Sequence, residues 1–260
     1  GVTEPLQAER GLSEAEREAG WILTCVRRAV DDVVLDAEVL DGVSLYPARN
    51  YPCKINAMER LAEDVVAVTL RLPPGQVLPF YPGQYVDIVM RDGVRRSYSR
   101  ANAPRADNQL ELQIRQVPGG AMSAYWFAAA KVNDLLQVKG PLGSFFLRES
   151  TGRHVVMLAT GTGIAPIKAM LEQIATQSPE QAPRSITLLW GGRHPGDLYW
   201  NPCSVDLQKA GITLDYRPVL SRADEQWQGA RGHVQDVLLQ QRQDFRDTAV
   251  YACGSEAMID

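Results

Sequence analysis

The sequence predicts two successive domains of different fold class, an antiparallel β-barrel followed by an α/β domain with a parallel sheet. In the first region apolar residues such as Val66, Val68 and Leu70 alternate with polar or small ones, and Pro-Gly turns separate these segments. In the second region continuous apolar strands alternate with helical segments, a pattern typical of parallel sheets. A chain of 260 residues is long enough for two such domains.

The barrel is expected over residues 46–150. The period of two begins near Cys53, and the glycine and prolines of Asp41–Pro52 indicate a linker in front of it. One helical segment, Ala121–Ala130, interrupts the strands.

The α/β domain is expected over residues 151–260. Val155–Ala159 is a continuous apolar strand, and a helix with one apolar face follows it. Further elements are expected at Ile186–Trp190, Ile212–Val219 and Thr248–Cys253 as strands and at Val234–Gln241 as a helix. Because the sequence stops soon after the last of these strands, we expect this domain to be incomplete at its C-terminus, without a final helix and strand.

Residues 1–45 differ from the rest in charge. They carry ten acidic and four basic residues, a net charge of −6, while the whole chain carries −4, so the remainder carries +2. This shift predicts a separate N-terminal module. It contains a predicted helix at Ser13–Ala19, capped by Ser13 with Glu16 three residues later, and an extended segment at Asp32–Leu40.

Composition excludes several classes of function. The net charge of −4 and the isoelectric point near 5.5 give no electrostatic basis for binding nucleic acid. Apolar runs are too short to cross a membrane, and no secretory leader is visible. The four cysteines form no C-x-x-C pair, so a disulfide scaffold is not expected and a reducing cytoplasm is predicted.

Three motifs follow one another in a fixed order: Arg96-Ser97-Tyr98-Ser99, then Gly161-Thr162-Gly163-Ile164-Ala165-Pro166, then Cys253-Gly254. Together they resemble the ferredoxin–NADP reductase superfamily of flavin-dependent electron-transfer enzymes. The resemblance implies an FAD-binding barrel followed by an NAD(P)-binding domain, with bound FAD and either NADH or NADPH as the electron donor.

The resemblance assigns the first motif to the flavin. It implies that Arg96 holds the FAD pyrophosphate, that Tyr98 packs on the flavin ring and that Ser99 approaches the flavin N5, with Ser97 between them. The chemistry agrees, because a guanidinium forks onto phosphate oxygens and a tyrosine offers a flat amphipathic face. Arg100 departs from the family, which usually has an apolar or small residue there. The resemblance therefore does not define the flavin edge or the partner surface at this position.

A second flavin motif is expected where the helical segment of the barrel begins. Backbone N–H groups at a helix start attract phosphate, and the family uses such a stretch for the FAD phosphates, although a plain hairpin turn is the alternative. The residues concerned are Gly119, Gly120, Ala121, Met122 and Ser123. Gln113-Ile114-Arg115 is expected to border the flavin.

The glycine turn after the first parallel strand is assigned to the dinucleotide. Gly161, Thr162 and Gly163 are expected to contact it, since glycines let the backbone approach a cofactor, and no G-K-[ST] follows that would indicate a P-loop. Ser221 and Arg222 could bind a 2′-phosphate, which leaves the choice between NADPH and NADH open. The resemblance places Cys253 and Gly254 at the junction of nicotinamide and flavin, without a nucleophilic role for the thiol.

Cys25 resembles the fourth cluster ligand of a plant-type ferredoxin, whose other three cysteines lie in C-x₄-C-x₂-C. Residues 1–45 are therefore interpreted as the remnant of a 2Fe-2S ferredoxin module. A [2Fe–2S] cluster is expected in the intact protein and not in this chain alone. An unrelated helical arm with a buried cysteine is the alternative.

The expected function is an oxidoreductase that passes electrons from NAD(P)H through FAD to an iron–sulfur centre or a partner protein, with Tyr98, Ser99 and Cys253 as the catalytic residues. The module order is that of CDP-6-deoxy-glucoseen reductases of dideoxysugar synthesis and of multicomponent oxygenase reductases. The electron-accepting protein is accordingly expected to be a dehydrase, or alternatively an oxygenase. A third hypothesis is a regulatory subunit that binds flavin without turnover.

Overall fold

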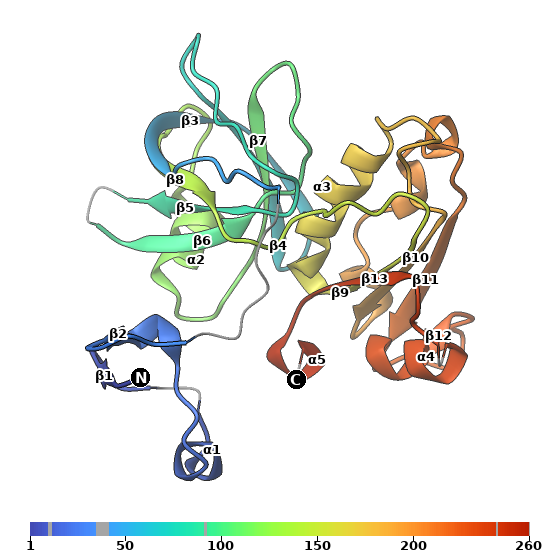
Figure 1. Ribbon diagram of the computed structural model, residues 1–260. Coiled ribbons are helices and arrows are strands. Elements are labelled where there is room, and N and C mark those ends of the chain that lie inside the picture. Colours follow the sequence, from blue (N-terminus) through green and yellow to red (C-terminus); the bar gives the residue numbers. More distant parts are fainter. Residues whose placement is uncertain (10–11, 35–41, 91–92, 243, 260) are drawn as a thin grey trace. The chain divides into compact units, whose positions relative to one another are not determined.

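The computed structural model describes residues 1–9, 12–34, 42–90, 93–242 and 244–259 (Figure 1). The chain divides into two compact units, Gly1–Leu45 and Tyr46–Asp260. No helix within the described ranges has the length and apolar character needed to span a membrane.

The first unit is small and held by local contacts. Strands β1 (Thr3–Pro5) and β2 (Arg27–Ala29) pair antiparallel. Helix α1 (Glu14–Glu18) begins with the predicted capping box, because the Ser13 amide donates to the Glu16 carboxylate at 2.7 Å and the Glu16 amide donates to the Ser13 hydroxyl at 3.3 Å. Of the predicted extended segment Asp32–Leu40, residues 32–34 form no strand and the rest lies outside the described residues.

The second unit begins with a six-stranded antiparallel sheet in the order β6-β5-β8-β3-β4-β7. Its strands are β3 (Arg49–Ala62), β4 (Val65–Arg71), β5 (Tyr85–Val89), β6 (Arg95–Ser99), β7 (Gln109–Arg115) and β8 (Leu135–Leu142). An antiparallel bridge between Arg100 and Leu112 joins the two outer strands, and the Ala101 amide donates to the Glu111 carbonyl at 2.8 Å beside it. This closing seam confirms the predicted antiparallel architecture.

Strand β3 corrects one boundary of the sequence analysis, because it begins at Arg49 while the linker was expected to reach Pro52. Pro52 pairs only with Gln137 of β8, since the pairing of β3 with β4 starts at Lys54. A proline lacks an N–H donor and is tolerated where only one neighbouring strand is present.

The helical interruption of the barrel consists of α2 (Ala121–Ala124) and a π-helical turn (Tyr125–Ala129). Met122 and Trp126 are buried in the barrel core, at 3% and 2% exposure. The segment therefore contributes to the barrel core, and the predicted helical interruption at Ala121–Ala130 is confirmed.

The rest of the second unit is a five-stranded parallel sheet in the order β12-β11-β10-β9-β13. Its elements are β9 (His154–Thr160), the 3₁₀ turn η3 (Gly161–Gly163), α3 (Ile164–Ile174), β10 (Ser185–Gly192), the 3₁₀ turn η4 (Pro195–Asp197), β11 (Leu214–Leu220), β12 (Ala230–Arg231), α4 (Val234–Gln241), β13 (Thr248–Cys253) and α5 (Glu256–Ile259). The expected parallel sheet is confirmed, with β11 starting two residues later than predicted.

Helices α3 and α4 cover opposite faces of this sheet and pack on separate apolar clusters. Helix α3 lies between the parallel and the antiparallel sheet (Figure 1). Its apolar face buries Ile167, Met170 and Leu171 completely against the parallel strands. This packing fixes the glycine turn at the start of α3 close to the barrel.

Candidate active site between the two sheets

A cleft of about 720 Å³ opens where β6 and β7 of the barrel meet the carboxyl ends of the parallel strands. From the barrel it is lined by Ser97, Tyr98, Ser99, Gln113, Arg115 and Val117. From the α/β region it is lined by Thr160, Gly161, Thr162, Gly163, Ala165, Gly191, Gly192, Arg193, Asp197, Ser221, Gly232, His233, Val234, Gln235, Cys253, Gly254, Ser255 and Met258. Nine of the sequence-predicted site residues thus share one cavity at the edge of the sheet where α/β proteins generally bind ligands.

Tyr98 is the flat aromatic residue on the barrel side of the cleft. Its hydroxyl accepts a hydrogen bond from Trp126 Nε1 at 3.0 Å, and the two rings meet edge-on at 6.2 Å. Burial raises the pKa of Tyr98, so the phenol stays neutral at physiological pH. The tryptophan holds the ring in one orientation, and a planar cofactor could stack against such a ring.

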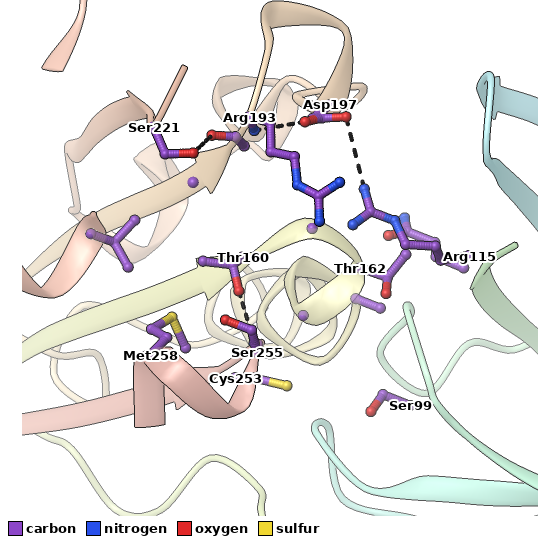
Figure 2. Close-up of a pocket in the computed structure, with 18 of the residues that line it drawn as sticks. Ser99, Arg115, Thr160, Thr162, Arg193, Asp197, Ser221, Cys253, Ser255 and Met258 are labelled. Carbon is purple, nitrogen blue, oxygen red and sulfur yellow. Dashed lines mark hydrogen bonds and ion pairs between the residues drawn. The ribbon is translucent and has the colours of Figure 1, made fainter. Parts of the chain in front are cut away.

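Ser97 and Ser99 lie on the same face of β6, because side chains two residues apart in a strand point to one side. The Ser97 hydroxyl donates to Asp87 Oδ1 at 2.6 Å. Ser99 lines the cleft from the barrel, and Cys253 lines it from the opposite domain (Figure 2).

Cys253 ends strand β13 with a half-buried thiol. Burial raises its pKa above the ordinary thiol value, so the group is the neutral thiol near pH 7. A neutral thiol is a poor nucleophile, and Cys253 therefore fits a packing role at the cleft better than a covalent one.

Close contacts within the protein explain the glycines of this site. A Cβ on Gly163 would lie 2.0 Å from the Cys253 carbonyl oxygen, and one on Gly254 would lie 2.0 Å from Thr160 Oγ1. The same Thr160 hydroxyl accepts a hydrogen bond from the Ser255 amide at 3.0 Å. From the sequence the glycines are expected to admit a cofactor, and the structure adds that they allow the loops after β9 and β13 to touch.

Gly161 allows the glycine turn to lie close to Arg115 of the barrel. It has a φ of +52°, and a Cβ there would lie 2.8 Å from Arg115 Nη1. Arg115 projects from the end of β7, with its Nε 3.1 Å from Asp64 Oδ2 and its Nη2 3.9 Å from Asp197 Oδ1. Figure 2 shows this arginine directed at Asp197 across the cleft. A cation is thereby placed between the barrel side of the cleft and the side formed by the parallel strands.

Seven of the residues predicted to bind FAD or the dinucleotide do not line the cleft. Arg96 is exposed, and its Nη1 donates to the Arg95 carbonyl at 2.7 Å. The side chain of Met122 is in the barrel core, and the Ser123 hydroxyl accepts from the Val117 amide at 2.8 Å. The remaining four are Gly119, Gly120, Ala121 and Arg222.

The lining residues that the sequence analysis missed include Thr160, His233 and Ser255. Thr160 and Ser255 directly flank the glycine turn and the Cys253-Gly254 pair. His233 directly precedes α4. Only their positions in the sequence could have indicated them. Each lies just after a predicted strand or just before a predicted helix, and such positions fall at the carboxyl edge of a parallel sheet.

Arg100, whose role the sequence left open, is buried and does not line the cleft. It is 1% exposed, and its guanidinium carbon lies 3.0 Å from the centroid of the Phe80 ring. Burial holds the pKa of this guanidinium well below its usual range. The residue contributes to the closing seam of the barrel.

Cys25 lies in the 3₁₀ turn Thr24–Val26 of the first unit. Its side chain is outside the described residues, so its predicted role as a cluster ligand stays a prediction.

Comparison with known proteins identifies both halves of the second unit. Residues 52–147 match the model of the oxidoreductase FAD-binding domain, and residues 157–260 match that of the oxidoreductase NAD-binding domain. The chain binds FAD and a nicotinamide dinucleotide, and the cleft fits both, because it joins an aromatic wall to a glycine-rich edge of parallel strands.

Relatives with similar sequences are reductases. A CDP-6-deoxy-L-threo-D-glycero-4-hexulose-3-dehydrase reductase of Yersinia pestis is 37% identical over 95% of this chain and 74% of its own length. A toluate 1,2-dioxygenase electron transfer component of Pseudomonas putida is 32% identical over 97% of this chain and 74% of its own length.

A solved structure of similar fold is the ferredoxin reductase in carbazole 1,9a-dioxygenase. It is 27% identical, has a TM-score of 0.75, and is matched over 100% of this chain and 77% of its own. Fold, cleft and sequence agree, and this chain belongs to the ferredoxin reductase family of FAD- and NAD(P)-dependent oxidoreductases.

Proposed function

We propose that this chain takes hydride from a nicotinamide dinucleotide and supplies the electrons to a sugar-nucleotide dehydrase through an iron–sulfur centre. The observation that supports this proposal most is that one cleft is lined by Tyr98 and Ser99 together with Gly161–Gly163 and Cys253. A dehydrase as the electron acceptor is supported by the dehydrase reductase of Yersinia pestis, which is 37% identical over 95% of this chain.

FAD, when bound, accepts a hydride and releases the electrons one at a time. On the barrel side Tyr98, in the orientation set by Trp126, would pack on the flavin ring, and Ser99 would donate a hydrogen bond to the flavin without blocking access. Arg96 is exposed on β6 and is free to turn its guanidinium toward the FAD pyrophosphate by breaking only its bond to the Arg95 carbonyl.

The other FAD phosphate contacts are assigned to backbone N–H groups at the start of α2, because the side chains of Met122 and Ser123 are engaged inside the barrel. Apart from Gly120, whose amide donates to the Val117 carbonyl at 3.0 Å, residues 119–123 would thus contribute amides and not side chains to this part of the site.

On the nucleotide side the backbone of Gly161, Thr162 and Gly163 receives the dinucleotide, and Cys253-Gly254 shapes the place of the nicotinamide. Arg193 and Ser221 line the cleft, and the Arg222 amide donates to the Arg193 carbonyl at 3.0 Å. A 2′-phosphate there would meet the Arg193 guanidinium, which supports NADPH as a donor, while NADH remains the alternative.

The domain boundaries are proposed at residues 45 and 150, with an FAD-binding barrel at 46–150 and an NAD(P)-binding domain at 151–260. Residues 1–45 are proposed to be the end of a ferredoxin-like module with Cys25 as one cluster ligand.

The free thiols of Cys53, Cys203 and Cys253 support a cytoplasmic location.

An anaerobic titration of the FAD-loaded protein with NADH and, separately, NADPH tests hydride transfer. Loss of the oxidised flavin absorbance near roughly 450 nm is expected, and the donor that acts at the lower concentration defines the preference. A bound flavin that neither donor reduces would indicate a flavin-binding regulator, and absence of flavin binding would contradict the assignment of β6.

The acceptor is tested by adding a purified sugar-nucleotide dehydrase or an oxygenase component to the reduced protein carrying its iron–sulfur module. Rapid reoxidation by the dehydrase is expected. Reoxidation by the oxygenase component alone would favour the second candidate, which the 32% identity to a dioxygenase electron transfer component supports.

A further inference from the structure

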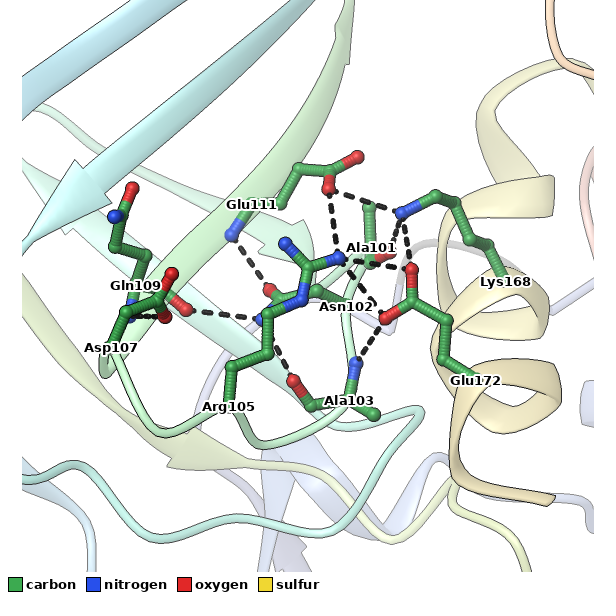
Figure 3. A network of polar contacts seen from close by, with 9 residues as sticks. All are labelled: Ala101, Asn102, Ala103, Arg105, Asp107, Gln109, Glu111, Lys168 and Glu172. Atoms are coloured by element: carbon green, nitrogen blue, oxygen red, sulfur yellow. Dashed lines mark hydrogen bonds and ion pairs between the residues drawn. The ribbon is translucent and has the colours of Figure 1, made fainter. Parts of the chain in front are cut away.

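Lys168 is a charged residue in the interior of the molecule. It lies in the second turn of α3 and is 8% exposed. Its ammonium donates to three acceptors, the Ala101 carbonyl at 2.8 Å, Glu111 Oε2 at 3.0 Å and Glu172 Oε1 at 2.8 Å (Figure 3). An ammonium has three donors, so each proton of Lys168 has a partner.

Two of these acceptors belong to the closing seam of the barrel. Ala101 comes two residues after Ser99, and its amide is bonded to the Glu111 carbonyl at 2.8 Å. Glu111 lies on β7, the strand that ends with Arg115. Lys168 therefore connects α3 with the two strands that carry the barrel side of the cleft.

The remaining members of the network fix its geometry. Arg105 Nη2 pairs with Glu172 Oε1 at 3.0 Å, and the Ala103 amide donates to Glu172 Oε2 at 3.0 Å. Burial favours protonation of Glu172, but the hydrogen bonds and charges of its neighbours outweigh it and lower its pKa. The group is thus a set of two cations and two carboxylates, with directional bonds in a partly desolvated place.

The glycine turn of the nucleotide side lies at the N-terminal end of α3. Gly163 directly precedes α3 and leaves no room for a Cβ against the Cys253 carbonyl. Lys168 is five residues further on, about 7 Å along the helix at about 1.5 Å per residue. A displacement of α3 at Lys168 would therefore be carried directly to the turn that faces the flavin.

We propose that Lys168 is a positioning residue for hydride transfer, which holds the glycine turn of α3 at a fixed place relative to Ser99 through Ala101, Glu111 and Glu172. The inference rests on the proposed function, because it assumes that the nicotinamide sits at the glycine turn and the flavin at β6. Hydride transfer depends steeply on the distance of the reacting atoms, so a small shift of α3 slows it.

A purely stabilising role makes a different prediction. Removing one partner of a buried ion network leaves uncompensated charge and lowers stability, so a purely stabilising role predicts a lower melting temperature without a slower flavin reduction. Lys168→Met and Lys168→Arg separate the two roles, because methionine removes the ammonium while arginine keeps the cation. Ile174→Val at the far end of the same helix is the matched control, since it perturbs the packing of α3 without touching the network.

The experiment is a stopped-flow measurement of flavin reduction at increasing nucleotide concentration with the full FAD-loaded chain. For Lys168→Met we expect the limiting rate to fall at least tenfold, while the dissociation constants of FAD and nucleotide, measured by calorimetry, change less than threefold. Lys168→Arg is expected to recover most of the rate, and Ile174→Val to stay within twofold of the unsubstituted protein. Hydrogen exchange of the Ala101 and Ala103 amides is expected to accelerate in Lys168→Met alone.

Each other outcome has a distinct meaning. A limiting rate within twofold of the unsubstituted protein, with only a lower melting temperature, would overturn the proposal and leave a stabilising network. Loss of FAD or nucleotide affinity in place of the rate would also overturn it. If Lys168→Met does not fold, Arg105→Gln, at the exposed side of the same network, is expected to reduce the rate by a smaller factor. Failure of the proposed function is recognised separately, because then the unsubstituted protein is not reduced by either nucleotide.

Discussion

The two walls of the cleft are built on different principles. The barrel wall presents side chains, such as Tyr98 and Arg115, that other side chains hold in place. The nucleotide wall presents backbone, and two of its glycines allow segments about 90 residues apart to touch, as the contact of Thr160 with Ser255 shows. A side chain can be shortened with a local loss, whereas a Cβ added to a tight backbone contact must displace a whole loop. Substitutions in the two walls should therefore differ greatly in effect.

Gly163→Ala should have the largest effect. The added Cβ would overlap the Cys253 carbonyl, so the turn or the loop after β13 has to move. We expect flavin reduction by nucleotide to slow by about 100-fold, the order expected for a displacement near 1 Å, together with destabilisation of about 1–3 kcal/mol. Stopped-flow reduction and thermal unfolding measure the two effects. Gly196→Ala is the control, because no atom lies within 4 Å of its Cβ position, and a similar loss there would contradict the explanation.

Ser99→Ala should give a smaller and purely kinetic effect. Removal of one neutral hydrogen bond costs about 0.5–1.5 kcal/mol, so the limiting rate of flavin reduction should fall about three- to tenfold. FAD affinity, measured by fluorescence titration, should hardly change. An unchanged rate would show that this hydroxyl does not face the reacting flavin.

Tyr98→Phe should affect stability more than rate. It keeps the aromatic face but leaves Trp126 Nε1 without its acceptor, at a cost of about 1–2 kcal/mol in unfolding free energy. Chemical denaturation measures this loss. Tyr98→Phe/Trp126→Phe removes both partners and should regain part of the stability if the hydrogen bond is the cause.

Thiol reactivity should give the smallest effect. The raised pKa of Cys253 keeps its thiol neutral, so alkylation at pH 7.5 should be slower at Cys253 than at the exposed Cys203. Because the folded-state pKa is raised, burial of Cys253 stabilises the fold least at high pH: the contribution is complete below the ordinary thiol pKa and is lost as the pH rises through the raised value. Mass spectrometry after timed alkylation between pH 7 and 9.5 checks the reactivity, and chemical denaturation over the same pH range checks the stability. Faster labelling of Cys253 would indicate an activated thiolate.

Much of the fold could be predicted from the sequence because its signals are local. Helix α4 has the predicted bounds Val234–Gln241, and the apolar run before the glycine turn is β9. The exception, Pro52, depends on a non-local fact, that β3 has one neighbour at that residue.

The residues that line the cleft were predictable only in part, and the contacts that hold them in place were not. Tyr98 and Cys253 were found through motif resemblance, but nothing near Gly163 in the sequence shows that the Cys253 carbonyl excludes a side chain there. The same holds for Lys168, which looks like an ordinary polar residue of an amphipathic helix until Glu111 and Ala101 are placed beside it.

The position of β13 beside β9 has a consequence for biosynthesis. The barrel is made first and contains its own core, whereas the nucleotide wall needs Cys253 and Ser255 to be packed against Thr160. Domains fold in the order of their synthesis, so a growing chain can assemble the flavin side well before the nucleotide side is finished. The nucleotide side of the cleft can therefore form only after Cys253 and Ser255 have been synthesised and packed against Thr160.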